Sequence, residues 1–520
     1  MKHTITIVSI WLLLLAFVTT GAIANEYQGT IRAGYTFTDI EGNQGVNQPT
    51  FNLYEGMAFS LEQFRYQWAD GMKLTAGVYN PMLNNRRLNL GLIKSGFGGV
   101  SLNHSSYRRT YDFDGGYFTR RRSTSGSAWV RPIKQVKLFG GIDYVGKNGS
   151  TIDFIEPASG DGLNQTDFTH QTYRGGVEVK YNRSYGRLEF NVADFNNDRD
   201  TTTDRTASRF RMTFYSPVPQ HEQFVLSGGF QRFVNRMENR ADTLAANTVW
   251  GAVQHYCRRG YQVRYSFMFD RARRTGDLTA TDNVLHAVHI GKTWLGRAGI
   301  TAGYGHRVND DAARQRSADE YSLTGWVKPV EALLVRGGMD FESNVVDSGR
   351  SLTGDQERAR HYISARYTFE DASLRLSLED RRRDNDDIGS STEFTRISAD
   401  LSVANEKYGD LSASYSFGSG DYDNAAGEFE YTEHTLSGEV WSREYQRLQA
   451  GFRGTYYRTR RDVDIESFSL EFTGRYGIHE RTRLELVYAA HNFDDLNDPS
   501  EFYSRYFTAN VVTAVLVYEL

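Results

Sequence analysis

The sequence has 520 residues, a formal net charge of −4 and a single cysteine, Cys257. The near-neutral charge argues against a polyanion-binding protein, so no nucleic-acid partner is expected. One cysteine excludes an internal disulfide and any cysteine-based metal site. Arginine supplies 50 of the 60 basic residues. Only 8 prolines interrupt the chain, which suits long, continuously paired β-strands.

Residues 1–24 predict a secretory signal peptide. A basic start precedes an apolar run from Ile5 to Val18, and Ala22-Ile23-Ala24 matches the small-residue cleavage pattern. The apolar run is short for a membrane-spanning helix, and no later segment approaches it in length. We therefore expect one mature domain, residues 25–520.

A strand pattern repeats along the whole of this mature domain. From Tyr173 to Tyr181, large apolar residues and glycine alternate with polar residues, and the same alternation runs from Tyr261 to Asp270. A period of two places one set of side chains on each face of a strand. The repeated pattern behind an export signal predicts an all-β fold, a transmembrane antiparallel up-and-down β-barrel in the bacterial outer membrane. A soluble secreted β-protein is the alternative.

Short polar turns alternate strictly with longer polar connections. Short turns are predicted at 69–71, 95–97, 131–135, 182–187, 216–222, 257–260, 295–297, 328–332, 370–372, 404–410, 442–446 and 476–481. Longer connections include 39–55, 147–170, 195–206, 234–247, 271–282, 307–318, 343–358, 380–393, 418–430 and 491–505. The count predicts about 26 strands, within a range of 22 to 28, with both termini at the periplasmic, short-turn end. No segment predicts a plug domain.

Tryptophan positions predict a periplasmic aromatic girdle. Tryptophan favours the membrane interface, where its ring is half buried and its indole N–H stays hydrated. Trp250 lies away from the short turns. The predicted girdle residues all lie near a short turn and are Trp68, Trp129, Trp294, Trp326 and Trp441.

The polar face of the strands predicts an arginine-rich lumen. The predicted lumen-facing residues are Arg32, Arg174, Glu178, Lys180, Arg209, Arg211, Arg264, Asp270, Arg336, Arg366, Arg375, Arg453, Arg475 and Arg483. In one interpretation, arginine–carboxylate pairs brace a polar wall. In the other, the guanidinium groups bind carboxylates on something inside the barrel.

The sequence contains no motif for catalysis or for binding a cofactor. There is no GxxxxGK[ST] phosphate loop, no HExxH zinc helix, no G-x-S-x-G elbow and no Cys-x-x-Cys-His haem attachment site. We therefore expect no enzyme activity, no catalytic or metal-ligand residues and no cofactor bound by this chain. The acidic connections could bind calcium, but none has a complete calcium-loop pattern, and solvated turn chemistry explains them more simply.

Barrel width points to a partner. A ring of about 26 strands tilted by about 40° is roughly 50 Å across. Porins of about 16–18 strands already contain an aqueous channel, and transporters of about 22 strands are plugged. A second polypeptide is therefore expected to fill the lumen.

This architecture resembles the porin component of outer-membrane porin–cytochrome conduits, the MtrB/PioB type. The resemblance covers residues 25–520 and rests on the strand number and the lack of a plug or soluble domain. It implies that the barrel contacts outer-membrane lipid outside and sheathes a periplasmic multihaem c-type cytochrome inside, so that electrons cross the membrane along haems of the partner protein. Some members carry an N-terminal Cys-x-x-Cys, whereas this chain has only Cys257.

Two other functions fit the sequence. A diffusion porin or substrate transporter would use the arginine-rich lumen to favour anions. A lipid- or polymer-export barrel would match in strand number, but the lipopolysaccharide-inserting barrels bring a periplasmic β-domain and paired cysteines that are missing from this sequence.

Overall fold

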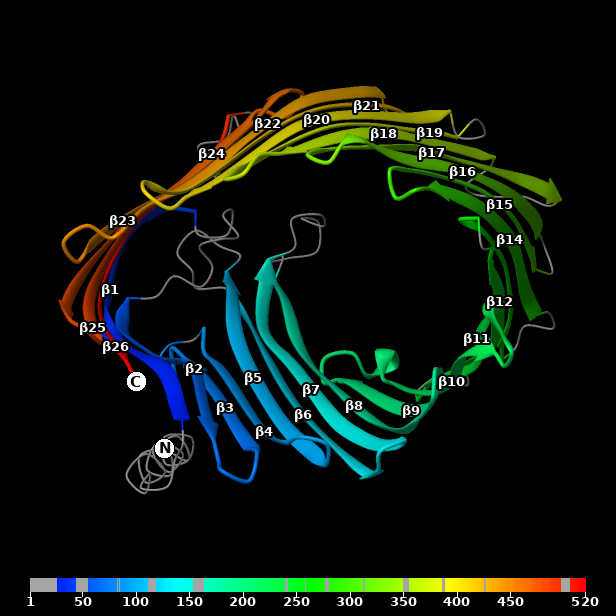
Figure 1. Ribbon diagram of the computed structural model, residues 1–520, viewed down its shortest axis with the longest axis horizontal. Helices are drawn as coiled ribbons and strands as arrows, with labels where there is room; N and C mark the ends of the chain where they lie inside the picture. The colour runs from blue at the N-terminus through cyan, green and yellow to red at the C-terminus, as the bar shows by residue number, and fades with distance from the viewer. Residues whose placement is uncertain are drawn as a thin grey trace.

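The protein is a closed antiparallel β-barrel (Figure 1). The computed structural model describes residues 26–43, 55–81, 83, 85–110, 118–152, 163–238, 242–257, 259–275, 280–311, 314–348, 355–385, 389–424, 427–496 and 506–520. The predicted signal peptide, residues 1–24, lies outside the described residues. Apart from the short 3-10 turn η2 (Thr201–Thr203), every element of the described residues is a strand of the barrel wall.

The strands follow one another around the ring in chain order. The first thirteen are β1 Glu26–Gly42, β2 Gly56–Gln67, β3 Met72–Tyr79, β4 Arg87–Lys94, β5 Gly98–Thr110, β6 Phe118–Ile133, β7 Val136–Ile152, β8 Leu163–Tyr181, β9 Ser184–Asn197, β10 Arg205–Val218, β11 His221–Met237, β12 Thr243–Tyr256 and β13 Tyr261–Arg274. The others are β14 Ala280–Trp294, β15 Ala298–Asp311, β16 Arg314–Val330, β17 Leu333–Ser348, β18 Gln356–Thr368, β19 Ala372–Asn385, β20 Ser390–Asn405, β21 Gly409–Asn424, β22 Gly427–Ser442, β23 Leu448–Arg461, β24 Ile465–His479, β25 Thr482–Asp495 and β26 Tyr506–Glu519.

The seam between the first and last strands closes the ring. β1 pairs antiparallel with β26 from Thr30 opposite Glu519 to Gly42 opposite Phe507, without a register shift. β1 pairs on its other side with β2, with a bulge between Gln28 and Thr30. The 26-stranded sheet therefore has no free edge, and it confirms the predicted all-β antiparallel barrel and its strand number. A plug-free barrel stays a prediction.

The predicted alternation of short and long connections holds only in part. The connections 312–313 and 425–426, at the long-connection end, have two residues each, whereas the short-turn connection 443–447 has five. The strands extend further than expected at the long-connection end. Much of the predicted connection 147–170 belongs to β7 and β8, and most of 418–430 belongs to β21 and β22. These extensions carry polar residues on both faces, so the apolar alternation ends before the hydrogen-bonded ladder does. Because sequence periodicity reports burial rather than backbone pairing, it underestimates strand length beyond the apolar band.

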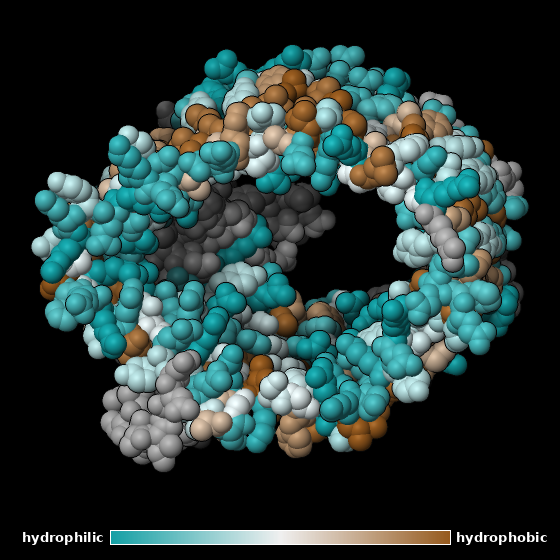
Figure 2. Space-filling model, viewed as in Figure 1, coloured by the Kyte–Doolittle hydropathy of each residue, from teal (hydrophilic) through white to brown (hydrophobic). Residues whose placement is uncertain are grey.

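The two faces of the wall differ in polarity. On one face, large apolar side chains are exposed: Ile142 is 44% exposed, Phe190 52% and Leu436 52%. Such a continuous apolar surface is stable only against lipid, so this is the outer face. In Figure 2, the surface around the central opening is mostly hydrophilic, and hydrophobic residues lie along the outer rim.

None of the described residues forms a helix that is long and apolar enough to cross a membrane.

Candidate functional site: the lumen wall

Strand register places every predicted lumen residue on the polar face. Arg174, Glu178 and Lys180 alternate with Tyr173, Val179 and Tyr181, all of which are exposed on the outer face. The same argument holds for the other predicted lumen residues. Each is next in sequence to an outer-face residue, which is either an exposed apolar residue or lies opposite one on the adjacent strand. These lumen residues are Arg32, Arg209, Arg211, Arg264, Asp270, Arg336, Arg366, Arg375, Arg453, Arg475 and Arg483.

Three of these arginines belong to ion pairs at the barrel seam. Glu485 of β25 is 3% exposed and accepts hydrogen bonds from Arg32 of β1 and from Arg475 Nε, the latter at 2.9 Å. The pair between Arg32 and Glu485 spans β26, where Val517 is fully buried. Arg483 bonds Glu519 of β26 at 2.6 Å. Charge pairs therefore brace the place where the two ends of the chain meet.

Further ion pairs brace the wall elsewhere. Glu178 lies 3.6 Å from Lys137 and 3.2 Å from Arg187. Arg453 lies 3.1 Å from Glu439 on the neighbouring strand. For these residues, the structure favours the interpretation in which arginine–carboxylate pairs stabilise a polar wall.

A second group of lumen arginines lacks such pairing. Among the described residues, no carboxylate lies within 4.0 Å of the following side chains: Arg211, Arg264, Arg336, Arg366 and Arg375. Arg366 and Arg375 even lie directly opposite each other on β18 and β19. Their guanidinium donors face the lumen and are available to a ligand or partner.

The girdle prediction is wrong for three of its five tryptophans. Val440 and Val327 are each more than 40% exposed on the outer face. Trp441 follows Val440 and Trp326 precedes Val327, so both tryptophans lie on the lumen face. Trp129 pairs with Phe139, which follows the outer-face residue Leu138 and therefore also faces the lumen.

The other two lie outside the lumen. Trp294 is 43% exposed on the outer face, as predicted for a girdle residue. Trp68 lies just past the end of β2 and packs edge-on against the ring of Tyr66 at 4.5 Å.

Each lumen-facing tryptophan covers a glycine on the adjacent strand. A Cβ added to Gly99 would lie 2.9 Å from Trp129 Nε1, and one added to Gly451 would lie 2.6 Å from Trp441 Cε3. Trp326 covers Gly299 in the same way. A glycine leaves room for the indole to lie flat on the wall. The inward orientation itself follows from the position of each tryptophan in the alternation of its strand. Proximity to a turn does not specify the face.

Trp250 belongs to the same group, although the sequence pattern set it apart. It covers Gly229, and the Arg211 guanidinium lies 5.4 Å from its ring centroid. Arg475 lies 4.3 Å from the ring of Trp441, and Arg131 lies 5.1 Å from that of Trp129. Distances in this range allow cation–π attraction. We call Trp129, Trp250, Trp326 and Trp441 the lumenal tryptophans. They lie in the second halves of β6, β12, β16 and β22, towards the short-turn end.

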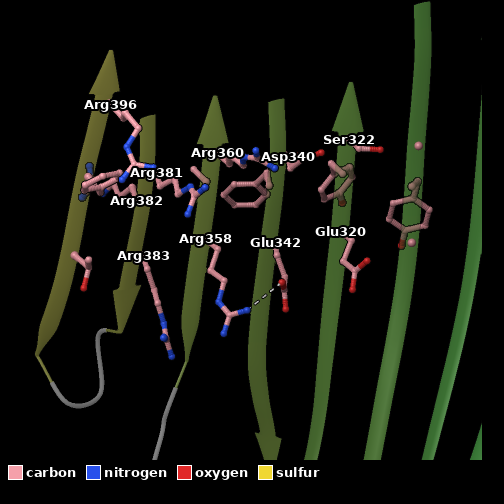
Figure 3. A pocket seen from close by; sticks show the side chains of 18 of the residues that line it. Glu320, Ser322, Asp340, Glu342, Arg358, Arg360, Arg381, Arg382, Arg383 and Arg396 are labelled. Atoms are coloured by element: carbon pink, nitrogen blue, oxygen red, sulfur yellow. Dashed lines mark ion pairs between the residues drawn. The ribbon is translucent and has the colours of Figure 1, made fainter. Parts of the chain in front are cut away.

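A hollow of about 710 Å³ lies in the lumen wall towards the long-connection end, between β14 and β22 (Figure 3). Its inward-facing cations come from three neighbouring strands, β18, β19 and β20. They are Arg358, Arg360, Arg381, Arg383 and Arg396. We call this group the arginine hollow.

Carboxylates neutralise part of the arginine hollow. Glu379 Oε1 accepts bonds of 2.7 Å from Arg360 Nε and from Arg381 Nε. Arg396 bonds Glu433 at 2.8 Å. These contacts offset the repulsion between arginines that lie directly opposite each other on β18 and β19.

Aromatic rings form the floor of the arginine hollow. The Arg396 guanidinium lies 5.0 Å from the ring of Phe394. The rings of Tyr422 and Tyr431 stack at 5.9 Å with an interplanar angle of 15°. Tyr431 lies beyond the apolar band. Burial, followed by the hydrogen bond with Tyr422, raises the pKa of its hydroxyl. Guanidinium forks above aromatic rings can bind a planar or aromatic anion.

Sequence reasoning missed the arginine hollow because its residues fell at or near predicted connections. Arg358 lies in the predicted connection 343–358, and Arg381, Arg383 and their neighbours lie in 380–393. The alternation of arginines at 358 and 360 and at 381 and 383 was the available signal, because cations at every second position share one face of a strand.

The described residues contain no group of three or more His, Cys, Asp or Glu side chains placed to hold a metal ion. In the acidic connection after β9, Asp200 accepts bonds from the backbone N–H and hydroxyl of Thr202, and Asp204 accepts one from the backbone N–H of Asn197. These two carboxylates stabilise the turn.

No known protein family and no curated protein matches this sequence. Among solved structures, the ferric-catecholate import receptor Fiu from K12 E. coli matches with a TM-score of 0.52 and 10% identity, over 95% of this chain and 82% of the receptor chain. A variant of the ferric enterobactin receptor PfeA from Pseudomonas aeruginosa matches with a TM-score of 0.51 and 9% identity, over 95% of this chain and 80% of that chain. The chain is an outer-membrane-type β-barrel. At this identity, the likeness shows the fold alone.

Proposed function

We propose that this barrel is the outer-membrane sheath of a porin–cytochrome electron conduit, of the MtrB/PioB type. In this role, the wall holds a multihaem c-type cytochrome in the lumen, contacts outer-membrane lipid outside, and insulates the haems of the partner. The observation that carries the proposal is a wall of 26 strands whose inner face is polar and rich in tryptophan and arginine.

The width of the wall suits a folded partner. A ring of 26 strands is roughly 50 Å across between backbones. Packed β-layers lie about 10 Å apart, so about 30 Å remains for the backbone of a protein that packs against the wall. A folded domain of about 100 residues has a radius of gyration of about 13 Å, which corresponds to a diameter of about 30–35 Å. This diameter is similar to the width that remains inside the wall.

The chemistry of the inner face also supports a protein partner. Tryptophan and arginine are enriched at protein interfaces and dominate their hot spots. The lumenal tryptophans are distributed around the ring on β6, β12, β16 and β22, and arginines without carboxylate partners, such as Arg264 and Arg336, lie on the same face. Their guanidinium groups suit the carboxylates of an acidic protein surface or of haem propionates.

A substrate transporter is the second candidate, and the arginine hollow favours it. A hollow of about 710 Å³ with cations above stacked aromatic rings has the size and the chemistry of a site for a small aromatic anion. In this function, the lumen would be open or gated, and the barrel would purify without a protein inside.

Purification from native membranes tests the proposal. A barrel carrying an affinity tag after the predicted signal peptide is expected to co-purify with one haem-staining protein and to show low ion conductance in planar bilayers. Photo-crosslinking residues placed at Trp326 in the lumen should capture that protein, whereas the same residue at Trp294 on the outer face should not. A barrel that purifies alone and conducts ions steadily would contradict the sheath and support the transporter.

A further inference from the structure

A row of lumen-facing side chains crosses the arginine hollow from an acidic strand to an aromatic one. Asp340 of β17 lies opposite Arg360 of β18, which lies opposite Arg381 of β19. Phe394 of β20 follows in the same register. On β21 this position is Gly420, and the ring of Tyr431 from β22 covers it, because a Cβ added to Gly420 would lie 2.4 Å from Tyr431 Cε1. The larger side chains of this row all line the hollow, and we call them the transverse row: Asp340, Arg360, Arg381, Phe394 and Tyr431.

The charges of the hollow are sorted by strand. On the side of β16 and β17, Glu320 lies opposite Glu342. On the side of β18 and β19, Arg358 lies opposite Arg383, next to the two arginines of the transverse row. Figure 3 shows the carboxylates Glu320, Asp340 and Glu342 on one side of the hollow and the arginines on the other. Like charges directly opposite each other destabilise a sheet, so this sorting does not serve the stability of the wall.

The sorting differs from other parts of the lumen. Opposite charges alternate along Glu439, Arg453 and Glu471 of β22, β23 and β24, and at the seam Glu485 lies between two arginines. Two other like-charged lumen pairs contain cations only: Arg121 with Lys147, and Arg366 with Arg375. Bracing of the wall accounts for alternating charges, whereas the hollow brings like-charged pairs of both signs together. This arrangement suits a ligand that itself carries both charges.

Hydrogen bonds within the hollow hold the two arginines of the transverse row and leave their outer ends accessible. Glu379 accepts bonds of 2.7 Å from the Nε–H groups of Arg360 and Arg381. Among the described residues, the Nη groups of these arginines make no hydrogen bond, and their side chains are 48% and 55% exposed. Asp340 has no hydrogen bond within the described part of the chain, and no cation there lies within 4.0 Å of it. A pair of guanidinium forks and a carboxylate therefore face the lumen side by side.

We propose that the transverse row binds a small aromatic zwitterion, a molecule with an amino group, a carboxylate and an aromatic ring. The Nη groups of Arg360 and Arg381 hold the carboxylate, because guanidinium forks bind carboxylates in a bidentate manner. Asp340 holds the ammonium group, and Phe394 and Tyr431 pack against the ring. From Asp340 to Phe394, the row crosses three strand spacings of about 4.8 Å, roughly 14 Å in all, which suits a ligand of about the size of a dipeptide.

The acidic side of the hollow distinguishes a zwitterion from a simple aromatic anion. A ligand with negative charge alone would be repelled by Asp340 and by Glu342, two positions further along β17. An amino group on the ligand turns this repulsion into attraction. The proposal does not rest on the sheath function, since the transverse row lies towards the long-connection end and the lumenal tryptophans lie towards the short-turn end.

Isothermal titration calorimetry with four dipeptide probes tests each part of the ligand. The full-length barrel is purified in detergent from native membranes, with any lumen partner that it retains. Glycyl-phenylalanine is expected to bind. N-acetylglycyl-phenylalanine lacks the ammonium group, glycyl-phenylalanine amide lacks the carboxylate, and glycyl-alanine lacks the ring. Each of these three probes should bind at least about tenfold more weakly, because each loses one charge-assisted or ring contact.

Two variants connect the probes to the transverse row. Asp340→Asn breaks no ion pair of the wall and should weaken glycyl-phenylalanine about tenfold, while binding of the acetylated probe should stay unchanged. Phe394→Leu should reduce the preference for glycyl-phenylalanine over glycyl-alanine. The control Asp400→Asn removes a lumen carboxylate on β20 that lies opposite Arg375, outside the hollow, and should bind all probes like the wild type. Heat-induced gel-mobility shifts verify that each variant is folded.

Three results would overturn the proposal. Equal affinity for glycyl-phenylalanine and its acetylated form would show a site for anions only. Equal weakening by Asp340→Asn and Asp400→Asn would show a general effect of lumen charge. Absence of binding by all four probes would leave the hollow as part of the wall. None of these results bears on the haem-staining partner, which co-purification and crosslinking at Trp326 detect separately.

Discussion

Replacing the buried carboxylate at the barrel seam should destabilise the whole ring. Glu485 accepts hydrogen bonds from Arg32 on β1 and Arg475 on β24, so it links strands at the two ends of the chain. Glu485→Gln removes the charge but keeps the shape of the side chain. Both arginines then lose their carboxylate acceptor next to the closing pair of strands.

The expected loss in the free energy of unfolding follows from the burial of the Glu485 ion pairs. Removing one partner of a fully buried ion pair costs about 3–5 kcal/mol. The Glu485 side chain is 4% exposed, but those of Arg32 and Arg475 are 25% and 30% exposed, so lumen water screens part of the charge. We therefore expect a loss of about 1–3 kcal/mol in the free energy of unfolding. In the matched control, Glu439→Gln, the carboxylate is 34% exposed and Arg453 58% exposed, so a loss of about 0–1 kcal/mol is expected.

Urea unfolding of the purified barrel in lipid vesicles, followed by tryptophan fluorescence, measures both variants. Heat-induced gel-mobility shifts provide a second readout, because an opened seam should lower the temperature at which the barrel unfolds in detergent. The reasoning fails if Glu485→Gln lies within about 0.5 kcal/mol of the wild type, or if Glu439→Gln costs as much. A double variant with Arg475→Met should recover part of the loss. Among the described residues, Glu485 is the carboxylate within 4.0 Å of Arg475, so its removal leaves that cation unpaired.

Two further predictions concern packing and orientation. Gly229→Ala should cost about 1–3 kcal/mol in the same unfolding assay, because the new Cβ would lie 2.2 Å from the backbone oxygen of Met212 and 2.5 Å from Trp250 Cζ2. Gly305→Ala, whose nearest contacts lie at 3.6 Å, should be nearly neutral. A bulky, membrane-impermeant maleimide should label Cys257, in the short turn after β12, only after outer-membrane permeabilisation, whereas Thr202→Cys in η2 should react in intact cells. Labelling of Cys257 in intact cells would reverse the assigned orientation.

Local patterns determined most of the architecture. Alternation such as that from Tyr173 to Tyr181 specifies a strand and its two faces, because side chains on a β-strand alternate with a period of two. Counting the polar turns and connections predicted the strand number, because each strand of this barrel pairs with its sequence neighbours. An even number of strands places both termini at one end. These features need no knowledge of distant contacts, so the sequence alone was sufficient to predict them.

Contacts that depend on register between strands required the tertiary structure. The partner of Arg32 is Glu485, 453 positions away along the chain, and only ring closure brings them together. The inward orientation of Trp326 follows from its parity within β16, not from its distance to a turn, and the indole lies over Gly299 of the neighbouring strand. Likewise, Arg366 and Arg375 become neighbours only when β18 and β19 pair. The sequence determined the wall and its two faces, whereas the pairing of strands decided which charges are balanced by a neighbouring charge.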